Sequence, residues 1–185
     1  MVAATHVATT IDREVAVTEP ASAGTRPVPP VFVQDFEVVA CPFDEIAHRM
    51  HVAPQELLAS GLIGARLEGD RLRGKVAPRA WPTVLAKTVE LRYQPARYQG
   101  DAVVLPFSWE AHGARSLFPR LDADLEAAPF GLAETQLTLQ ARYLPPGGRL
   151  GIELDRVLLF RIAQWTIRAF LAAVVETLMG ERRAP

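Results

Sequence analysis

The chain has 185 residues, of which 49% are hydrophobic and 22% charged, and its formal net charge is -1. This length is enough for one sizeable core. The near-zero charge excludes the strongly basic field that draws a protein to nucleic acid or to an anionic membrane. The single cysteine, Cys41, excludes an internal disulfide and is typical of a reducing cytosol, so we expect a cytoplasmic protein.

The amino-acid composition of the chain changes near residue 30. Residues 1–30 contain the run TEPASAGTRPVPP and little that can pack, so we expect a disordered leader without a signal peptide. One folded domain is then expected over residues 31–185. VFVQDFEVVA predicts a first strand that ends before Pro42. CPFDEIAHRM and APQELLAS predict two short helices, with Pro42 in the first turn of the first and Gly61 as the stop of the second.

Between Leu62 and Pro145, apolar and polar residues alternate, which predicts six further antiparallel strands with one buried and one solvated face. Gly69-Asp70 predicts a tight hairpin, and Gln99-Gly100 a second turn. The buried face is expected to carry Leu85, Val89, Leu91, Tyr93, Val103, Leu105, Phe107, Trp109, Leu121, Ala123, Leu125, Ala127, Leu137, Leu139, Ala141 and Tyr143. The solvated face is expected to carry Thr88, Glu90, Arg92, Gln94, Asp122, Asp124, Glu126, Glu134, Gln136, Gln140 and Arg142.

The most apolar stretch is RVLLFRIAQWTIRAFLAAVVETLMG, residues 156–180. A membrane span needs about 20 nearly uncharged residues, and a charge at mid-bilayer costs at least about 2.5 kcal/mol. Charged and polar residues interrupt this stretch at positions 161, 164, 168 and 176, so we expect no integral membrane segment. The polar face is neither strongly basic nor continuous, which favours packing on the sheet over lying on a membrane surface.

The same stretch predicts an amphipathic helix that starts near the PPGG before Arg149 and stops at Gly180. Positions 161, 164, 168 and 172 share its polar face. The opposite face is expected to carry Leu159, Ala163, Thr166, Phe170, Val174 and Thr177.

The order strand, two short helices, six strands and long helix predicts an α+β fold, and it resembles the START-related, birch-pollen-allergen-like (SRPBCC) superfamily. LPFSWEAHGARSLFPRLDADLEAAP, followed by TQLTLQARYLPP, is also similar to uncharacterised bacterial members of that group. The resemblance covers about residues 31–180. It implies a helix-grip fold, in which a curved seven-stranded antiparallel sheet wraps a long C-terminal helix around an apolar cavity. The glycine-rich turn of the plant members is replaced here by the hairpin LEGDRLRG, so their ligands do not carry over.

Small inward residues among large ones, Ala123, Ala127 and Ala141, also indicate unfilled volume under the helix. Trp109 and Tyr143 would form an aromatic wall with a polar edge. The alternative is that the large aromatic side chains fill this space. The residues expected to bind a ligand are Phe107, Trp109, Leu125, Leu139, Tyr143, Leu159, Thr166 and Phe170. Those expected at the cavity mouth are His112, Leu117 and Phe118, of which the last two have homodimer contact as an alternative role.

Two clusters of polar residues are weaker candidates. Asp122, Asp124 and Glu126 lie about 7 Å apart on the solvated face of one strand, which favours a charge ladder balanced by Arg92 and Arg142 over a metal site. His48 and His51 have the i, i+3 spacing of two metal ligands, but a third ligand is not evident. The sequence therefore predicts neither a metal nor a cofactor.

Two single residues also need an interpretation. Lys87 interrupts the buried face, and we expect its side chain to reach the rim of the sheet rather than to be buried. Cys41 is expected to be buried and structural.

The function expected first is binding or carriage of an apolar small molecule such as a lipid, an isoprenoid or a polyketide-like compound. The alternative is an enzyme of the aromatase or cyclase type, for which the buried face offers Tyr143, Lys87 and His112 as acid or base. A third interpretation is an interaction domain with a collapsed cavity.

Overall fold

The structure is a computed structural model that describes residues 29–77, 86–111, 120–143 and 156–181. The expected leader and the loop that holds the expected cavity mouth lie outside the described residues. The described elements, in chain order, are β1 (Val31–Val39), α1 (Phe43–Val52), α2 (Pro54–Ser60), β2 (Ile63–Glu68), β3 (Arg71–Val76), β4 (Lys87–Tyr93), β5 (Arg97–Gln99), β6 (Ala102–Ala111), β7 (Leu121–Phe130), β8 (Glu134–Tyr143) and α3 (Arg156–Glu181).

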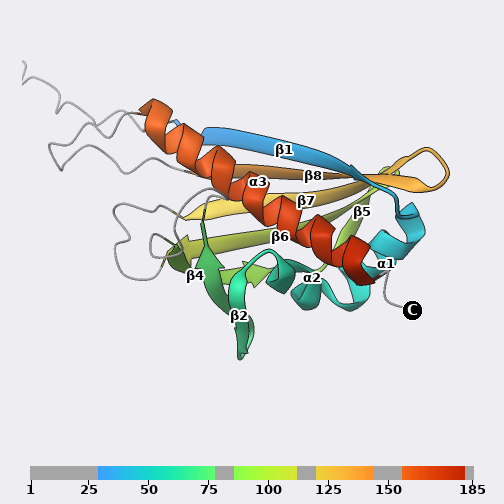
Figure 1. Cartoon of the computed structure of the whole chain (residues 1–185), viewed down its shortest axis with the longest axis horizontal. Helices are drawn as coiled ribbons and strands as arrows, with labels where there is room; N and C mark the ends of the chain where they lie inside the picture. The colour runs from blue at the N-terminus through green and yellow to red at the C-terminus, as the bar shows by residue number, and fades with distance from the viewer. Residues whose placement is uncertain (1–28, 78–85, 112–119, 144–155, 182–185) are drawn as a thin grey trace, which may run out of the picture.

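The strands form one antiparallel sheet in the order β1-β8-β7-β6-β4-β3-β2, with β5 paired to β6 beside this path. The seven-stranded sheet expected from the sequence is therefore confirmed, and β5 is an additional strand. Figure 1 shows α3 running diagonally across one face of the sheet, with α1 and α2 near its C-terminal end. We call the face toward α3 the inner face and the opposite one the outer face.

The short strand β5 is explained by proline. Pro106 lies in the middle of β6, a strand paired on both sides, yet proline has no N–H for a ladder hydrogen bond. The strand beside β6 is interrupted at Pro106: β4 ends at Tyr93, opposite Phe107, and β5 begins at Arg97, opposite Val104. The Pro106 carbonyl still accepts a hydrogen bond of 2.9 Å from the Gln94 amide.

The two short helices lie where the sequence predicts them. Pro42 is the N-cap of α1 rather than part of its first turn, and Gly61 follows α2 as its C-cap, as expected. Cys41 is buried, and its carbonyl accepts a 2.7 Å hydrogen bond from Thr135 Oγ1 of β8. This bond fixes the start of α1 against the sheet.

The long helix α3 continues through Gly180 to Glu181, so the predicted stop at Gly180 is wrong. Its expected start near Arg149 lies outside the described residues. By length and composition, Phe160–Gly180 is apolar enough to cross a membrane, a test that the core helix of a folded domain also passes. Here the helix packs against β1 and α2, and its residues Ile167, Phe170, Leu171, Val174 and Leu178 are buried.

The buried face of α3 differs from the predicted one. Phe170 and Val174 are buried as expected, but Ile167, Leu171 and Leu178 were not expected there. Thr166 and Thr177 are only half-buried, and their hydroxyls donate to carbonyls of the helix itself, at 2.7 and 3.1 Å. Ala172, expected on the polar face, is buried as well. The prediction followed the polar positions, whereas contact with β1 and α2 selects which apolar side chains are buried.

Candidate functional site

The inner face brings the predicted apolar residues into rows that run across the strands. One row consists of Leu91, Trp109, Leu121 and Tyr143, and the adjacent row of Tyr93, Phe107, Ala123 and Ala141. All are buried except Tyr93, which is half-buried. The predicted facing of these strands is therefore confirmed, apart from Leu85, which lies outside the described residues.

Three predicted ligand residues form an aromatic cluster between the sheet and α3. The ring of Phe170 is stacked on Phe107 at a centroid distance of 5.5 Å and tilted against Trp109 at 5.5 Å. Phe107 and Trp109 are themselves 5.9 Å apart. Such pairs contribute about 0.5–1.5 kcal/mol each beyond burial. The cluster therefore gives this end of the inner face a rigid aromatic wall.

Gly61 makes room for this cluster, a role that its prediction as a helix stop did not include. A Cβ atom at Gly61 would overlap the ring of Phe170, with Cδ2 only 2.6 Å away. The glycine thus sets how closely α2 and α3 approach. The sequence carries no signal for this contact, because the two residues are far apart in the chain.

Tyr143 is a polar residue of the inner face. It is 6% exposed, and its buried hydroxyl has no hydrogen-bond partner within the part of the chain that the structure describes. An unsatisfied buried hydroxyl costs about 1–3 kcal/mol. Burial also raises the pKa of Tyr143 above its ordinary value of 10.0, so the hydroxyl keeps its proton at neutral pH. It is available to donate a hydrogen bond to a molecule placed beside it.

The side chains next to Tyr143 are small. Ala141 precedes it by two residues on the same face of β8, and Ala123 lies opposite Ala141 on β7. Both are buried. The inner face therefore carries two small side chains in the row of Phe107, next to the row that contains Trp109 and Tyr143.

The other predicted ligand residues have different environments. Leu125 and Leu139 are opposite each other on β7 and β8 and are fully buried in the core. The Thr166 hydroxyl donates to the Ile162 carbonyl, so it is already satisfied. Leu159 belongs to α3, but its side chain lies outside the described part of the chain, as do the mouth residues His112, Leu117 and Phe118.

Charged groups at the β1 edge of the inner face were not expected. Asp35 pairs with Leu139 in the register and accepts hydrogen bonds of 2.8 and 3.3 Å from Arg168 of α3. This hydrogen bond and then the Asp35 charge raise the pKa of Arg168, with a further contribution from the charge of Glu37. The pair ties α3 to β1. The alternation in VFVQDFEVVA could have predicted this, because side chains at its odd-numbered positions point inward and include Asp35 and Glu37.

The remaining candidates from the sequence fall outside this site. Lys87 is exposed at the start of β4, as expected for a rim position. His51 Nδ1 lies 2.8 Å from the Ala47 carbonyl, and the ring stacks on Tyr98 at 5.2 Å. In the described ranges, no group of three His, Cys, Asp or Glu residues is placed to hold a metal ion.

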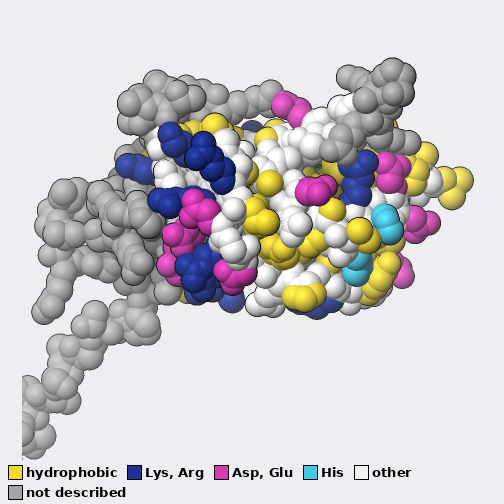
Figure 2. All heavy atoms as spheres, turned by 90° about the horizontal axis from the view of Figure 1, so that it is seen from below, with side chains coloured by type: hydrophobic (Ala, Val, Ile, Leu, Met, Phe, Trp, Pro, Cys, Tyr) yellow, Lys and Arg dark blue, Asp and Glu magenta, His cyan; other side chains and the backbone are white. Residues whose placement is uncertain are grey.

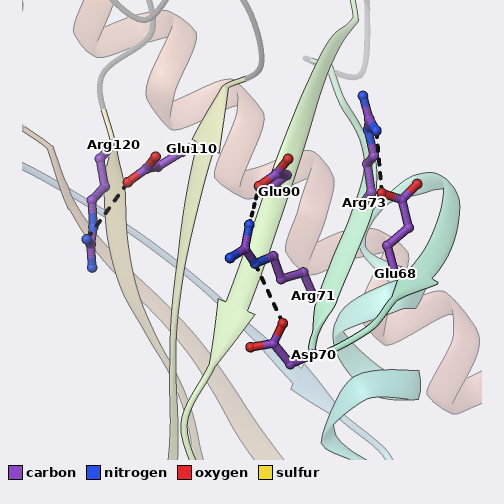
Figure 3. A network of polar contacts seen from close by, with 7 residues as sticks. All are labelled: Glu68, Asp70, Arg71, Arg73, Glu90, Glu110 and Arg120. Carbon is purple, nitrogen blue, oxygen red and sulfur yellow. Dashed lines mark hydrogen bonds and ion pairs between the residues drawn. The ribbon is translucent and has the colours of Figure 1, made fainter.

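Of the predicted charge ladder, the pair between Asp122 and Arg142 is present on the outer face. Asp122 accepts a 2.8 Å hydrogen bond from Arg120 Nε and lies 3.9 Å from Arg142 Nε. Figure 3 shows the adjoining network on the side of the sheet away from α3, where Arg71 lies between Asp70 and Glu90. Both signs of charge are interleaved at one end of the surface in Figure 2. These pairs are solvent-exposed, and such pairs typically contribute about 0–1 kcal/mol each.

A hollow of about 650 Å³ also lies on the outer face. Its walls include Arg92, Arg142, Asp122 and Asp124. Phe107 is the one predicted ligand residue among the described residues that line this hollow. Its charged walls differ from the apolar cavity that the sequence predicts on the inner face.

Several solved structures have a similar backbone. Norcoclaurine synthase from Thalictrum flavum, in complex with dopamine and hydroxybenzaldehyde, is 12% identical, with a TM-score of 0.57 over 91% of this chain and 97% of that one. A conserved protein from Geobacillus kaustophilus is 14% identical (TM-score 0.53; 81% and 96% covered), and Ara h 8.0201 is 9% identical (TM-score 0.53; 82% and 99% covered). No protein-family model and no curated protein sequence matches the chain.

At these identities the likeness establishes the fold alone. The chain shares the helix-grip fold of these structures, so the fold that the resemblance implies is confirmed.

Proposed function

We propose that the protein binds or carries an apolar small molecule between the inner face of the sheet and α3, with Tyr143 as the polar anchor. The unpartnered, buried Tyr143 hydroxyl is the observation that carries this proposal. A buried polar group without a partner is rare in native proteins and is normally satisfied by water or a ligand. A ligand oxygen that accepts from Tyr143 removes that cost on binding.

The walls around the hydroxyl define the chemical class of ligand. The aromatic cluster of Phe107, Trp109 and Phe170 offers apolar and ring-stacking surface, and Ala123 and Ala141 in the row of Phe107 are small. Apolar burial then supplies most of the affinity, at about 25 cal/mol per Å². A largely apolar molecule with one acceptor oxygen fits, such as a lipid, an isoprenoid or a polyketide-like compound. The single cysteine suits a cytoplasmic protein of this kind.

An enzyme of the aromatase or cyclase type is the second candidate, and one observation favours it. Because burial raises the pKa of Tyr143, its hydroxyl stays protonated at neutral pH and can donate a hydrogen bond to a substrate oxygen, while it becomes a weaker acid for full proton transfer. Of the three groups the sequence offers for chemistry, it is the one the structure places buried on the inner face, since Lys87 is exposed and His112 lies outside the described residues. A similar fold is used by an enzyme, norcoclaurine synthase.

The proposal is tested by native mass spectrometry of the freshly purified protein, followed by solvent extraction of any bound compound. We expect a discrete extra mass. Tyr143→Phe removes one hydrogen bond, which is equivalent to about tenfold weaker binding. Tyr98→Phe is the matched control, because Tyr98 is 65% exposed and lies opposite Val103, at the other end of β6 from the row that contains Tyr143.

The outcomes separate the three functions. A ligand lost from Phe170→Ala and reduced in Tyr143→Phe supports the binding site. Chemical conversion of the extracted compound by wild-type protein but not by Tyr143→Phe supports the enzyme. A clean mass without ligand, and no thermal shift with a panel of lipids and polyketides, contradicts both and leaves the domain with a collapsed cavity.

A further inference from the structure

Another hollow, of about 460 Å³, lies on the outer face where β2, β3 and β4 run side by side. Three cations line it: Arg66 of β2, and Arg73 and Lys75 of β3. Glu68 is the one carboxylate among the described residues of its walls. The whole chain has a formal net charge of -1, so three cations around one hollow are a local excess and not a general property of the surface.

The register of the strands brings these cations together. Arg66 lies directly opposite Arg73 in the ladder between β2 and β3, so their Cα atoms are about 4.5–5.5 Å apart. Lys75 follows Arg73 by two residues on the same face of β3, about 7 Å further along the strand. Like charges directly opposite each other destabilise a sheet. An anion bound between them would remove this repulsion.

The cations are only partly neutralised by carboxylates. Arg73 has an ion pair with Glu68, at 3.4 Å. Glu90 lies opposite Arg73 on β4, but its carboxylate is 3.3 Å from Arg71 and does not line the hollow. Figure 3 shows these as two separate pairs. Within the described part of the chain, no ion pair joins a carboxylate to the other two cations of the hollow.

Glycine leaves the floor of the hollow open. Gly64 and Gly74 both line it, and neither has a side chain to fill it. The register between β2 and β3 shifts at Gly64, whose φ of 63° is the left-handed conformation of a glycine bulge. A bulge leaves one residue outside the hydrogen-bonded ladder and is common beside functional sites. The floor is therefore main chain, with Thr88 of β4 beside it.

A charge and a bulge on β2 have a second explanation, because β2 is an edge strand. Proteins place both on edge strands to prevent pairing with a strand of another chain. This explains Arg66 and Gly64. It does not explain Arg73 and Lys75, since β3 is paired on both sides, with β2 and with β4. The cations of β3 therefore favour a ligand over edge protection.

The chemistry of the walls points to a phosphate group. An arginine fork can make two hydrogen bonds to phosphate oxygens, and a lysine adds a point charge. The volume is in the range of small-molecule sites and exceeds that of a phosphate alone, and the exposed Ile63 adds an apolar wall. A long polyanion such as nucleic acid would also meet the nearby carboxylates of Glu68, Asp70 and Glu90, which would repel it.

We propose that this hollow binds the phosphate group of a phosphorylated organic molecule through Arg66, Arg73 and Lys75, with the organic part against Ile63. A soluble phosphomonoester and a phospholipid headgroup share this chemistry. The hollow lies on the outer face, so the inference does not depend on the proposed ligand site between the inner face and α3. Because Arg66 and Lys75 are exposed, binding is expected to weaken as the salt concentration rises.

An NMR titration of the full chain with phenyl phosphate tests the site. The amide signals of Gly64, Gly74 and Thr88 are expected to shift and to saturate in the millimolar range. Arg66→Gln removes charge-assisted hydrogen bonds and is expected to weaken binding about tenfold. Arg97→Gln is the matched control, because Arg97 is an exposed cation of β5 outside the hollow and its loss changes the net charge equally.

Three results would overturn the proposal. Amide shifts that do not saturate, or that weaken equally in Arg66→Gln and Arg97→Gln, would mean that anions are attracted to the surface in general. Self-association of Arg66→Gln with unchanged binding of phenyl phosphate would mean that the charge protects the edge of β2. A single-stranded oligonucleotide that binds more tightly than phenyl phosphate, and less tightly to Arg66→Gln, would make the site one for nucleic acid.

Vesicle flotation identifies the source of the phosphate group. Binding to phosphatidylcholine vesicles that contain phosphatidic acid, lost in Arg66→Gln and displaced by phenyl phosphate, supports a lipid headgroup. Saturable binding of phenyl phosphate without binding to these vesicles supports a soluble phosphomonoester. Tyr143→Phe leaves the three cations in place and is expected to bind phenyl phosphate as the wild type does.

Discussion

Tyr143 and Phe170 are both buried aromatic residues of the inner face, but they depend on their neighbours in different ways. Phe170 is surrounded by two rings and by the backbone of Gly61, so its position is fixed by packing. Tyr143 has apolar neighbours in its row and a hydroxyl with no partner. In the proposed ligand site, Phe170 forms part of the aromatic wall and Tyr143 supplies the hydroxyl that would donate to the ligand.

Replacing Tyr143 with phenylalanine is expected to stabilise the ligand-free protein by about 1 kcal/mol, because the unsatisfied hydroxyl is removed. The gain should grow with pH. The folded-state pKa of Tyr143 is raised above 10.0, so above about pH 10 the unfolded chain loses this proton more readily than the folded protein does. The free energy of unfolding of the wild type is therefore unaffected below about pH 10 and falls as the pH rises through the folded-state pKa, whereas Tyr143→Phe has no such loss. Urea denaturation of both proteins at neutral pH and near pH 10.5 measures this. A difference that narrows with pH would show that the hydroxyl is satisfied or ionised in the fold.

Gly61 gives a second prediction at this scale. Gly61→Ala forces a methyl group against the Phe170 ring, and overpacking of this kind costs about 1–3 kcal/mol. Gly180→Ala is the matched control, because Gly180 lies within α3 with nothing within 4 Å of an added Cβ. Alanine there should stabilise the protein by about 0.5–1 kcal/mol. The melting temperature should therefore fall for Gly61→Ala and rise for Gly180→Ala. An unchanged melting temperature for Gly61→Ala would mean that the Phe170 ring can turn away.

At the scale of whole elements, strands were predicted more accurately than the long helix. A strand residue points to one of two faces, so the alternation of LDADLEAAPF and ETQLTLQARY fixes every side chain at once. A helix can be turned through any angle about its axis. The pattern of α3 allows several apolar faces, because Phe160 and Trp165 are also apolar and yet 38% and 43% exposed. Contact with β1 and α2 selects one of these faces.

The orientation of α3 is tested by two truncations. Leu171→Ala removes a fully buried side chain and is expected to cost about 2–5 kcal/mol. Trp165→Ala removes a larger side chain that is 43% exposed, and is expected to cost less than the leucine does. Denaturant unfolding gives both free energies. The reverse order would mean that α3 is rotated from the orientation described here.

At the scale of the whole molecule, one hydrophobic cluster joins all the layers. It contains residues of the sheet such as Leu125 and Leu139, of α1 and α2 such as Met50 and Leu58, and of α3 such as Leu171. Because the sheet and the helix share this core, they are expected to unfold together. A ligand held between them should then stabilise the entire domain and not one element.

This coupling predicts the size of the ligand effect. A ligand at 100 times its dissociation constant raises the free energy of unfolding by about 2.7 kcal/mol. For a domain of this size, the melting temperature should then rise by about 5–10 °C. Differential scanning calorimetry with the extracted compound measures the shift, which should be smaller in Tyr143→Phe than in Tyr98→Phe. Two separate transitions would contradict a single cooperative core.

The sequence by itself determined the order of the elements apart from β5, and the inward and outward faces of β4, β6, β7 and β8, because these depend on local periodicity and on turn residues near in the chain. The fold then followed from the resemblance of this element order to known proteins. It also indicated Phe107, Trp109, Tyr143 and Phe170 as inward aromatic residues. Only the tertiary structure decided that Phe170 stacks on Phe107 against Gly61, that Tyr143 lacks a hydrogen-bond partner, and that Arg168 pairs with Asp35. These contacts join residues that are distant in the chain, and their geometry depends on how α3 is turned and placed on the sheet.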